Sequence, residues 1–214
     1  MKKLLIILLA LSPAIFYTSC KKDETVSKVV NVSFPSIKLN GEKYVTLNVG
    51  QTYDDPGAVS TDDISGATAN LKADYSSLDV NTPGIYYMQY KAKNANGYIT
   101  NVGRYIAVTN YQDDFDFSGV YERTSNGVQV NITKVSRGLY MTDDMGGAGL
   151  PDAAYFAIID NSTIDFGPQL SESIGAEIDA SGETVEIDGT DVTIQYALSA
   201  AGYGTAPRTF VRVQ

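Results

Sequence analysis

Residues 82–100 read TPGIYYMQYKAKNANGYIT, and this stretch decides the kind of fold. Thr82-Pro83-Gly84 is a turn signal, because proline presets φ and glycine tolerates positive φ. The residues after it alternate between two sets, as the two faces of a β-strand require. The set predicted to face a core is Tyr86, Met88, Tyr90 and Ala92, and the opposite set is Ile85, Tyr87, Gln89 and Lys91. Asn96-Gly97 then marks a tight hairpin.

Similar alternation recurs along the rest of the chain. Turn signals return every roughly eight to twelve residues, with short alternating runs between them, which is typical of a β-sandwich or β-barrel. No long segment keeps the 3.6-residue apolar period of an amphipathic helix. Helix is therefore expected only as a turn or two around Leu170 to Ile178. The pattern predicts an all-β protein.

An acidic stretch near residue 112 separates two predicted β domains. The first spans residues 32–111 and has alternating runs at 37–39 and 44–49. The second spans residues 112–214, and its short runs are 119–123, 128–135, 139–142, 154–159, 163–166, 184–187, 192–198 and 209–213. Within the second of these runs, Val135 joins the face of Val130 and Ile132 only through a slip in register.

Short motifs in the first domain follow the order seen in a known family. They are Leu39-Asn40-Gly41, Val49-Gly50, Tyr53, Asp55-Pro56-Gly57-Ala58, Thr82-Pro83-Gly84, Tyr86, Tyr90, Gly97 and Arg104. Over residues 35–109 the chain resembles the bacterial surface Ig-like, or HYR-like, domain. The resemblance implies an Ig-like sandwich that serves as a spacer or an adhesion unit. The arm over residues 98–103 is longer than the usual strand of this family, which leaves its ends open.

The second domain resembles the C-terminal β domain of a family of Bacteroides-type surface lipoproteins. The motifs that carry this resemblance are Phe117-Ser118-Gly119-Val120-Tyr121-Glu122-Arg123, Val130 to Lys134, Gly138-Leu139-Tyr140-Met141-Thr142-Asp143 and Gly146-Gly147. The family brings no established activity, although its members often occur near outer-membrane glycan-uptake systems. The expected fold class is all-β, with an Ig-like β-sandwich followed by a small antiparallel β-barrel or sandwich domain.

The chain begins with an export signal. A basic start precedes an apolar run over residues 4–16, which is too short to span a bilayer core. We expect a signal peptide over residues 1–19 and a flexible tether over residues 20–31. Cys20, the only cysteine, follows Thr18 and Ser19, which resembles a lipoprotein lipobox and implies acylation of Cys20. An ordinary signal peptide with an unmodified cysteine is the alternative.

The charged residues after Cys20 bear on where the protein is displayed. Lys21, Lys22, Asp23 and Glu24 resemble the surface-export signal of Bacteroides-type lipoproteins, and a solvated charged tether is the alternative. The resemblance implies an outer-membrane, cell-surface location with the lipid as the anchor. Loss of Lys2 and Lys3 with the leader takes the net charge from −9 to −11. Because such a charge is repelled by anionic surfaces, the acyl chains must hold the protein there.

Composition excludes several classes of function. With 16 Lys+Arg against 25 Asp+Glu, the chain lacks the positive charge that nucleic-acid binding requires. The absence of His excludes an imidazole base and a Ser–His or Cys–His nucleophile. A single Cys excludes an internal disulfide and a thiolate metal cluster. We therefore expect no enzyme.

Carboxylates are the common catalytic groups that remain. Asp54/Asp55, Asp62/Asp63 and Asp143/Asp144 fall in turns, where Asp typically caps its own backbone, so a carboxylate-dependent glycosidase ranks third among the functions considered. Acidic turns between Ig-like domains can also bind calcium. The candidate ligands are Asp113, Asp114 and Asp116, and no other cofactor is expected.

The 15 tyrosines supply the candidates for ligand binding, since sugars dock on flat aromatic faces. Tyr87 and Tyr105 are predicted on outward strand faces. Tyr155 is placed near a loop, and Tyr203 at the tip of the loop over residues 199–207. Tyrosine is also an ordinary strand residue, which is the alternative.

Taken together, these features predict a non-enzymatic outer-membrane surface lipoprotein. It would bind an extracellular ligand, with glycans as the main candidate, or act as an accessory to an outer-membrane nutrient-uptake complex. A structural or adhesive module that binds proteins or cells is the alternative.

Overall fold

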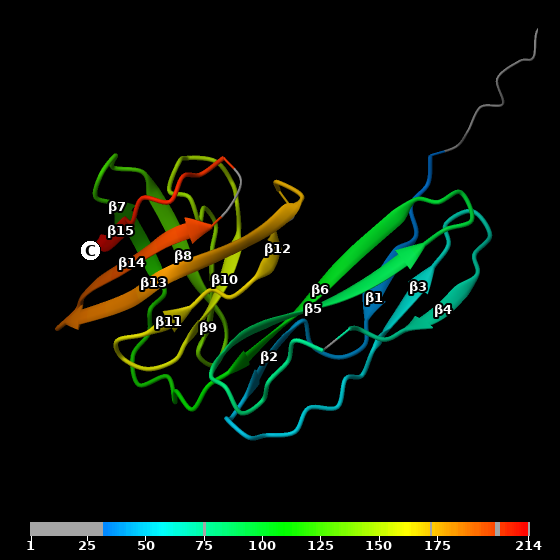
Figure 1. Ribbon diagram of the computed structural model, residues 1–214, viewed down its shortest axis with the longest axis horizontal. Coiled ribbons are helices and arrows are strands. Elements are labelled where there is room, and N and C mark those ends of the chain that lie inside the picture. Colours follow the sequence, from blue (N-terminus) through cyan, green and yellow to red (C-terminus); the bar gives the residue numbers. More distant parts are fainter. Residues whose placement is uncertain (1–31, 75, 172, 200–201, 214) are drawn as a thin grey trace, which may run out of the picture. The chain divides into compact units, whose positions relative to one another are not determined.

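β-strands make up all the regular secondary structure of the computed structural model, which describes residues 32–74, 76–171, 173–199 and 202–213 (Figure 1). The all-β prediction is confirmed. The expected signal peptide, tether, lipid-bearing Cys20 and export signal at residues 21–24 all lie outside these ranges. Ser33–Gln214 is one compact unit. Among the described residues, no helix is long and apolar enough to cross a membrane.

Two three-stranded sheets are built from the first half of the described chain. In sheet order, the first contains β1 (Ser36–Leu39), β3 (Ala58–Thr61) and β4 (Thr68–Leu71). The second contains β2 (Tyr44–Leu47), β6 (Ile99–Val108) and β5 (Gly84–Lys93). β5 and β6 form the long hairpin predicted at Asn96-Gly97, whereas β2 runs parallel to β6.

The core between these sheets has the residues that the alternation in β5 predicts. Met88 and Tyr90 are fully buried, and Ala92 is 6% exposed. They pack with Leu47 and Ile106 and with partly buried side chains from β1 and β2. The assignment of this face of β5 to the core is therefore confirmed.

Arg104 is fully buried in this part of the chain and lies at the centre of a polar network. Its guanidinium pairs with the Asp55 carboxylate and donates to the hydroxyls of Tyr53, at 3.0 Å, and Tyr90, at 2.6 Å. It also donates to the backbone carbonyl of Glu42 at 2.9 Å. Burial, followed by hydrogen bonding to Asp55, raises the pKa of Tyr90 above its ordinary range. The arginine thus joins the segment before β2, the segment before β3, and the β5–β6 hairpin.

One nine-stranded antiparallel sheet contains the strands of the second half. In sheet order these are β11 (Ile164–Asp165), β10 (Ala154–Ile158), β9 (Leu139–Thr142), β8 (Gln129–Ser136), β7 (Gly119–Arg123), β15 (Arg208–Val213), β14 (Asp191–Ser199), β13 (Ala176–Asp188) and β12 (Gln169–Ser171). The sheet curls (Figure 1) until β11, at one end, contacts β13, the strand next to the other end. There, the backbone N–H of Val185 donates to the backbone carbonyl of Ser162 at 3.0 Å.

The core of the curled sheet follows the predicted faces. Val192, Ile194, Tyr196 and Leu198 of β14 are all buried. The slip predicted before Val135 is present as a shift of register between Lys134 and Ser136. The shift does not bring Val135 onto the face of Val130 and Ile132, as predicted: those two side chains lie in the core of the curled sheet, whereas Val135 packs in a different cluster.

The helical turn predicted around Leu170 to Ile178 is wrong. Gln169–Ser171 is β12 and Ala176 begins β13, with a turn closed by the Gly175 N–H and the Ser171 carbonyl at 3.0 Å. The four-residue spacing of Leu170, Ile174 and Ile178 suggests a helix. Because a tight turn falls between the two strands, the same spacing also fits a hairpin.

A side chain closes the seam between β10 and β12. Gln169 is 3% exposed, and its Oε1 accepts the Tyr155 backbone N–H at 2.8 Å. Its Nε2 donates to the Tyr155 carbonyl at 2.7 Å and to the Phe166 carbonyl at 2.6 Å. The amide therefore takes the place that a neighbouring strand would occupy beside Tyr155.

Several aspartates hold turns through their own side chains. Asp62 accepts the N–H groups of Ile64 and Ser65 at 2.9 Å, and Asp79, Asp116 and Asp160 each accept from the N–H two residues ahead. These hydrogen bonds stabilise the ionised carboxylate. They are the largest cause that lowers the pKa of each of these four side chains.

Candidate functional site

Four tyrosines meet where the β5–β6 hairpin packs against β10. The ring centroids of Tyr105 and Tyr155 lie 3.9 Å apart, and Tyr87 lies 5.1 Å from Tyr105. The hydroxyls of Tyr44 and Tyr155 are hydrogen-bonded at 2.9 Å. The ammonium of Lys43 lies 5.4–5.9 Å from the centroids of three of these rings, within the range of a cation–π contact. The cluster forms an aromatic layer between the two halves of the compact unit.

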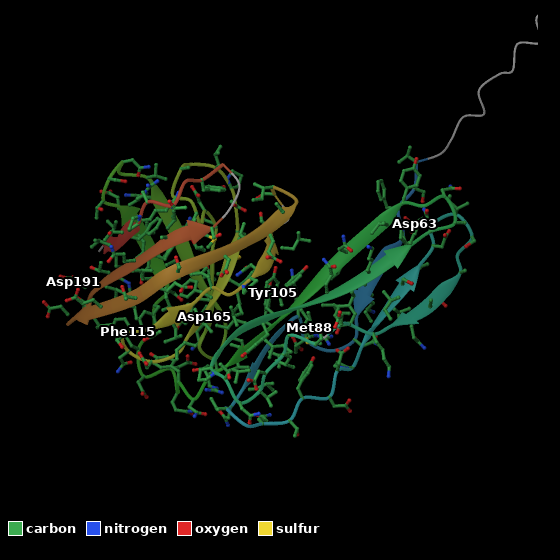
Figure 2. The ribbon with its side chains drawn as sticks, viewed as in Figure 1. Asp63, Met88, Tyr105, Phe115, Asp165 and Asp191 are labelled. Atoms are coloured by element: carbon green, nitrogen blue, oxygen red, sulfur yellow. The ribbon has the colours of Figure 1, made fainter. Side chains whose placement is uncertain are left out.

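Three of the predicted binding tyrosines, Tyr87, Tyr105 and Tyr155, are part of this layer, and the last two are buried. Tyr105 was expected to face outward but is 3% exposed (Figure 2). Tyr155 was expected near a loop but lies in β10 and is 8% exposed. The prediction of an outward ring is wrong for Tyr105, because the outer face of the hairpin packs against β9 and β10 around Leu139 and Ala157. Tyr155 follows the loop before β10, and its ring is buried in the same cluster.

Tyr87 is half-buried, and its ring lies over Gly103 on the neighbouring strand. A Cβ at position 103 would lie 1.9 Å from Cε2 of Tyr87. The ring can rest on the sheet in this position only because residue 103 has no side chain. Of the four predicted tyrosines, Tyr87 lines the larger cavity of the two beside this layer.

Tyr203 is also less exposed than the tip of a loop would be. Its hydroxyl donates to Asp152 at 2.8 Å, and its ring packs on Gly146, where a Cβ would lie 2.3 Å from Cε1. Burial, followed by the hydrogen bond to Asp152, raises the pKa of Tyr203 to about 12. The side chain therefore holds the loop against the sheet, and it lines neither cavity beside the tyrosine layer.

A cavity of about 490 Å³ opens beside Tyr87. Its walls are Ser77, Ile85, Tyr86, Tyr87 and Gln89 from one half, and Pro168, Gln169, Leu170 and Glu177 from the other. The volume falls within the usual range for small-molecule sites. In the described part of the chain, the side chains of Gln89 and Glu177 have no hydrogen-bond partner, so an amide and a carboxylate are available to a ligand beside an aromatic ring.

A second cavity, of about 300 Å³, also has Leu170 in its wall. Its walls are Tyr105, Asp143, Pro151, Ala153, Tyr155, Leu170 and Ser173. Both oxygens of the Asp143 carboxylate accept from Asn131, at 2.8 and 2.6 Å. The Ser173 hydroxyl donates to Asp152 at 2.5 Å. The polar groups of this cavity are therefore satisfied by the protein. We call the two cavities together the tyrosine groove.

Two of the three aspartates proposed as calcium ligands, Asp113 and Asp116, have separate partners. Asp113 pairs with Lys134 at 2.7 Å and accepts the Gly138 N–H at 2.9 Å. Asp116 accepts the Ser118 N–H at 2.9 Å. Across the described ranges, no group of three or more His, Cys, Asp or Glu residues is arranged to hold a metal. The geometry lends the calcium prediction no support.

Two other carboxyl groups belong to strands near the ends of the curled sheet, Asp165 to β11 and Glu183 to β13. Burial is the largest cause of the shift in the pKa of each. Asp165 accepts the Ile85 N–H at 2.6 Å, and Glu183 accepts the Phe166 N–H at 3.0 Å. Burial raises the pKa of both, and the mutual repulsion of their charges raises the pKa of Glu183 further. The pKa of each group is therefore higher in the folded protein than in the unfolded chain. The stability that each shift contributes to the folded protein is fully present below the unfolded pKa and is lost as the pH rises through the folded pKa.

Replacement of Asp165 by Asn is expected to lower the pKa of Glu183 toward its ordinary value without reaching it. The substitution removes the repulsive charge but leaves the burial of Glu183, which is the larger cause. Carboxyl-carbon NMR titration of the wild type and of D165N measures this shift. Asp62, whose low pKa comes from its own turn, serves as the internal control and should not move. An unchanged pKa of Glu183 would show that the two carboxyls do not interact.

Sequence reasoning missed the polar residues of the groove. Gln89 and Glu177 sit in separate strands with no motif around them, and Leu170 was assigned to a helical turn. The alternation in β5 does place Gln89 on the same face as Tyr87. That face could have been chosen as a candidate site only with knowledge of what packs against it.

Comparison with known proteins identifies the first part of the described chain. Residues 37–108 match the family model described as "Bacterial surface protein, Ig-like domain", which confirms the resemblance in that region. No curated protein matches the chain. Among solved structures, the chain is similar to the crystal structure of the lipoprotein BT2262 from Bacteroides thetaiotaomicron, with 24% identity over 84% of this chain and 100% of that one, at a TM-score of 0.35.

Proposed function

We propose that this chain is a lipid-anchored protein of the outer-membrane surface that binds an extracellular oligosaccharide without catalysis. The observation that carries the proposal is the cavity of about 490 Å³, whose walls bring together the ring of Tyr87 and the side chains of Gln89 and Glu177. The apolar face of a sugar ring stacks on an aromatic side chain, while amide and carboxylate groups fix its hydroxyls. The groove offers both kinds of contact within one cavity.

The location of the protein is supported by its sequence and by the family match. The leader, the lipobox around Cys20 and the acidic residues that follow predict export and acylation. The matched family model describes a bacterial surface protein. A surface anchor would place the groove where extracellular sugars reach it. An accessory role in nutrient uptake fits the same placement.

A binding role is favoured over hydrolysis by the distribution of carboxylates. Among the described residues that line the larger cavity, Glu177 is the only acid. Asp143 lines the second cavity and is hydrogen-bonded to Asn131. Glycoside hydrolysis by the common mechanism needs two carboxyl groups facing each other across the bond.

A structural or adhesive module is the second candidate, favoured by the tight packing of the β5–β6 hairpin on β10. Ile85, Tyr105 and Ala107 are buried against Leu139 and Ala157 in one apolar cluster. Such packing suits a spacer that holds the second half in one orientation. The two roles differ in whether a free oligosaccharide binds in solution.

Isothermal titration of the chain from residue 21 with neutral and acidic oligosaccharides tests the proposal. We expect binding of a neutral oligosaccharide, weakened about tenfold or more by Gly103→Ala. The new methyl group would lift the Tyr87 ring from the sheet and into the cavity. Asn101→Ala, an exposed change on the same strand, should leave the affinity unchanged. Absence of binding to every sugar in the set, with cells or proteins bound instead, would favour the adhesive module.

A further inference from the structure

The second cavity of the tyrosine groove differs from the first in its chemistry. Its wall includes Tyr105, Tyr155, Pro151, Ala153 and Leu170, whose side chains are mostly apolar. The two polar residues in its wall, Asp143 and Ser173, are hydrogen-bonded within the protein. A group that enters this cavity gains apolar contact and finds no unpaired polar partner among the described residues of its wall. An apolar group is therefore favoured there over a hydroxylated one.

Leu170 makes the two cavities neighbours. It lines both of them, and it belongs to β12, the strand that Gln169 fixes beside Tyr155. A molecule held in the first cavity by Tyr87, Gln89 and Glu177 would therefore reach the second cavity across this one side chain. The groove offers a polar compartment and an apolar compartment to the same ligand.

The charge of the groove further limits the chemical classes of ligand that can bind. No Lys or Arg is among the described residues that line either cavity, whereas Glu177 and Asp143 are acidic. The chain carries a net charge of −9. An anionic ligand would be repelled on approach by this net negative charge and by the acidic residues of the walls.

We propose that the ligand is an uncharged sugar that carries an apolar substituent, such as an aryl or acyl group. The sugar occupies the first cavity and the substituent occupies the second, in contact with Leu170, Ala153 and the edges of Tyr105 and Tyr155. This inference rests on the proposed function, because it assumes that the first cavity holds a sugar. It adds the chemical class of the ligand and its orientation across Leu170.

The experiment compares a neutral oligosaccharide from the titration set with its benzyl glycoside. We expect the benzyl glycoside to bind about tenfold more tightly, because the phenyl ring leaves water for the apolar compartment. In Ala153→Phe the new ring fills the second cavity from its exposed rim. That variant should abolish the gain and retain the affinity for the parent sugar. Ala69→Phe on the exposed strand β4 is the matched control and should retain both affinities.

Each outcome separates this inference from the proposed function. If the parent sugar binds and the benzyl group brings no gain, the apolar compartment is not used and the inference is overturned. A gain that persists in Ala153→Phe overturns it as well, because the phenyl ring then lies elsewhere. If neither the parent sugar nor the benzyl glycoside binds, the proposed function itself fails. A gain lost only in Ala153→Phe supports the assignment.

Discussion

Replacement of Arg104 by Leu is expected to lower the free energy of unfolding by about 3–5 kcal/mol, because it leaves the buried charge of Asp55 without its partner. Tyr53, Tyr90 and the carbonyl of Glu42 also lose a hydrogen-bond donor. The chain has no Trp. Urea unfolding followed by far-ultraviolet circular dichroism is therefore the suitable measurement.

A second ion pair provides the control for this prediction. Lys134 and Asp113 lie 2.7 Å apart, but their side chains are 36% and 21% exposed. Lys134→Ala should therefore cost less than about 1 kcal/mol. Should Arg104→Leu prove too unstable to purify, Arg104→Lys keeps the charge and loses the forked geometry, and an intermediate loss is expected. Equal losses in Arg104→Leu and Lys134→Ala would contradict the role given to the network.

Gln169→Ala is the second substitution with a large expected effect, a loss of about 2–4 kcal/mol. It leaves the N–H and carbonyl of Tyr155 and the carbonyl of Phe166 without their partner at a buried position. Gln169→Met fills nearly the same space but offers no such hydrogen bonds, so its loss should be similar. The same urea experiment applies, with hydrogen exchange at the Tyr155 amide as a local readout.

Gln195→Ala tests whether the loss belongs to the seam. Gln195 is an exposed residue of β14, and its replacement should change the unfolding free energy by less than about 0.5 kcal/mol.

A well-protected Tyr155 amide in Gln169→Ala would mean that β10 finds another partner there. In that case the curled sheet does not depend on the glutamine.

The alternation of apolar and polar residues predicts most of the fold, because it indicates which side chains of each strand are buried. It places Met88 and Tyr90 in one core and Ile194 and Tyr196 in another, as the structure confirms. It also sets the bounds of β7 and β9 correctly. It misses β4, whose first three residues are all exposed and therefore show no buried face, and β12, whose three residues hold too few alternations to stand out.

The candidate site is harder to read from the sequence, for a physical reason. Alternation tells that Tyr87 and Tyr105 leave the sandwich core, but it cannot tell solvent from a second packed surface. Tyr105 meets Tyr155, a residue 50 positions later, and no local pattern encodes that contact. Three of the four predicted tyrosines line the groove, whereas the predicted outward position is wrong for Tyr105.

The aspartates that close their own turns have a consequence for how this surface can change over time. Four of these side chains add to the negative charge of the protein, and their carboxylate oxygens also accept the hydrogen bonds that close the turns: Asp62, Asp79, Asp116 and Asp160. A lineage that moved toward electrical neutrality by losing them would also loosen its loops. Selection for the loop conformations should therefore also preserve these negative charges. Natural sequence variation that changes the net charge is expected at the lysines more often than at these aspartates.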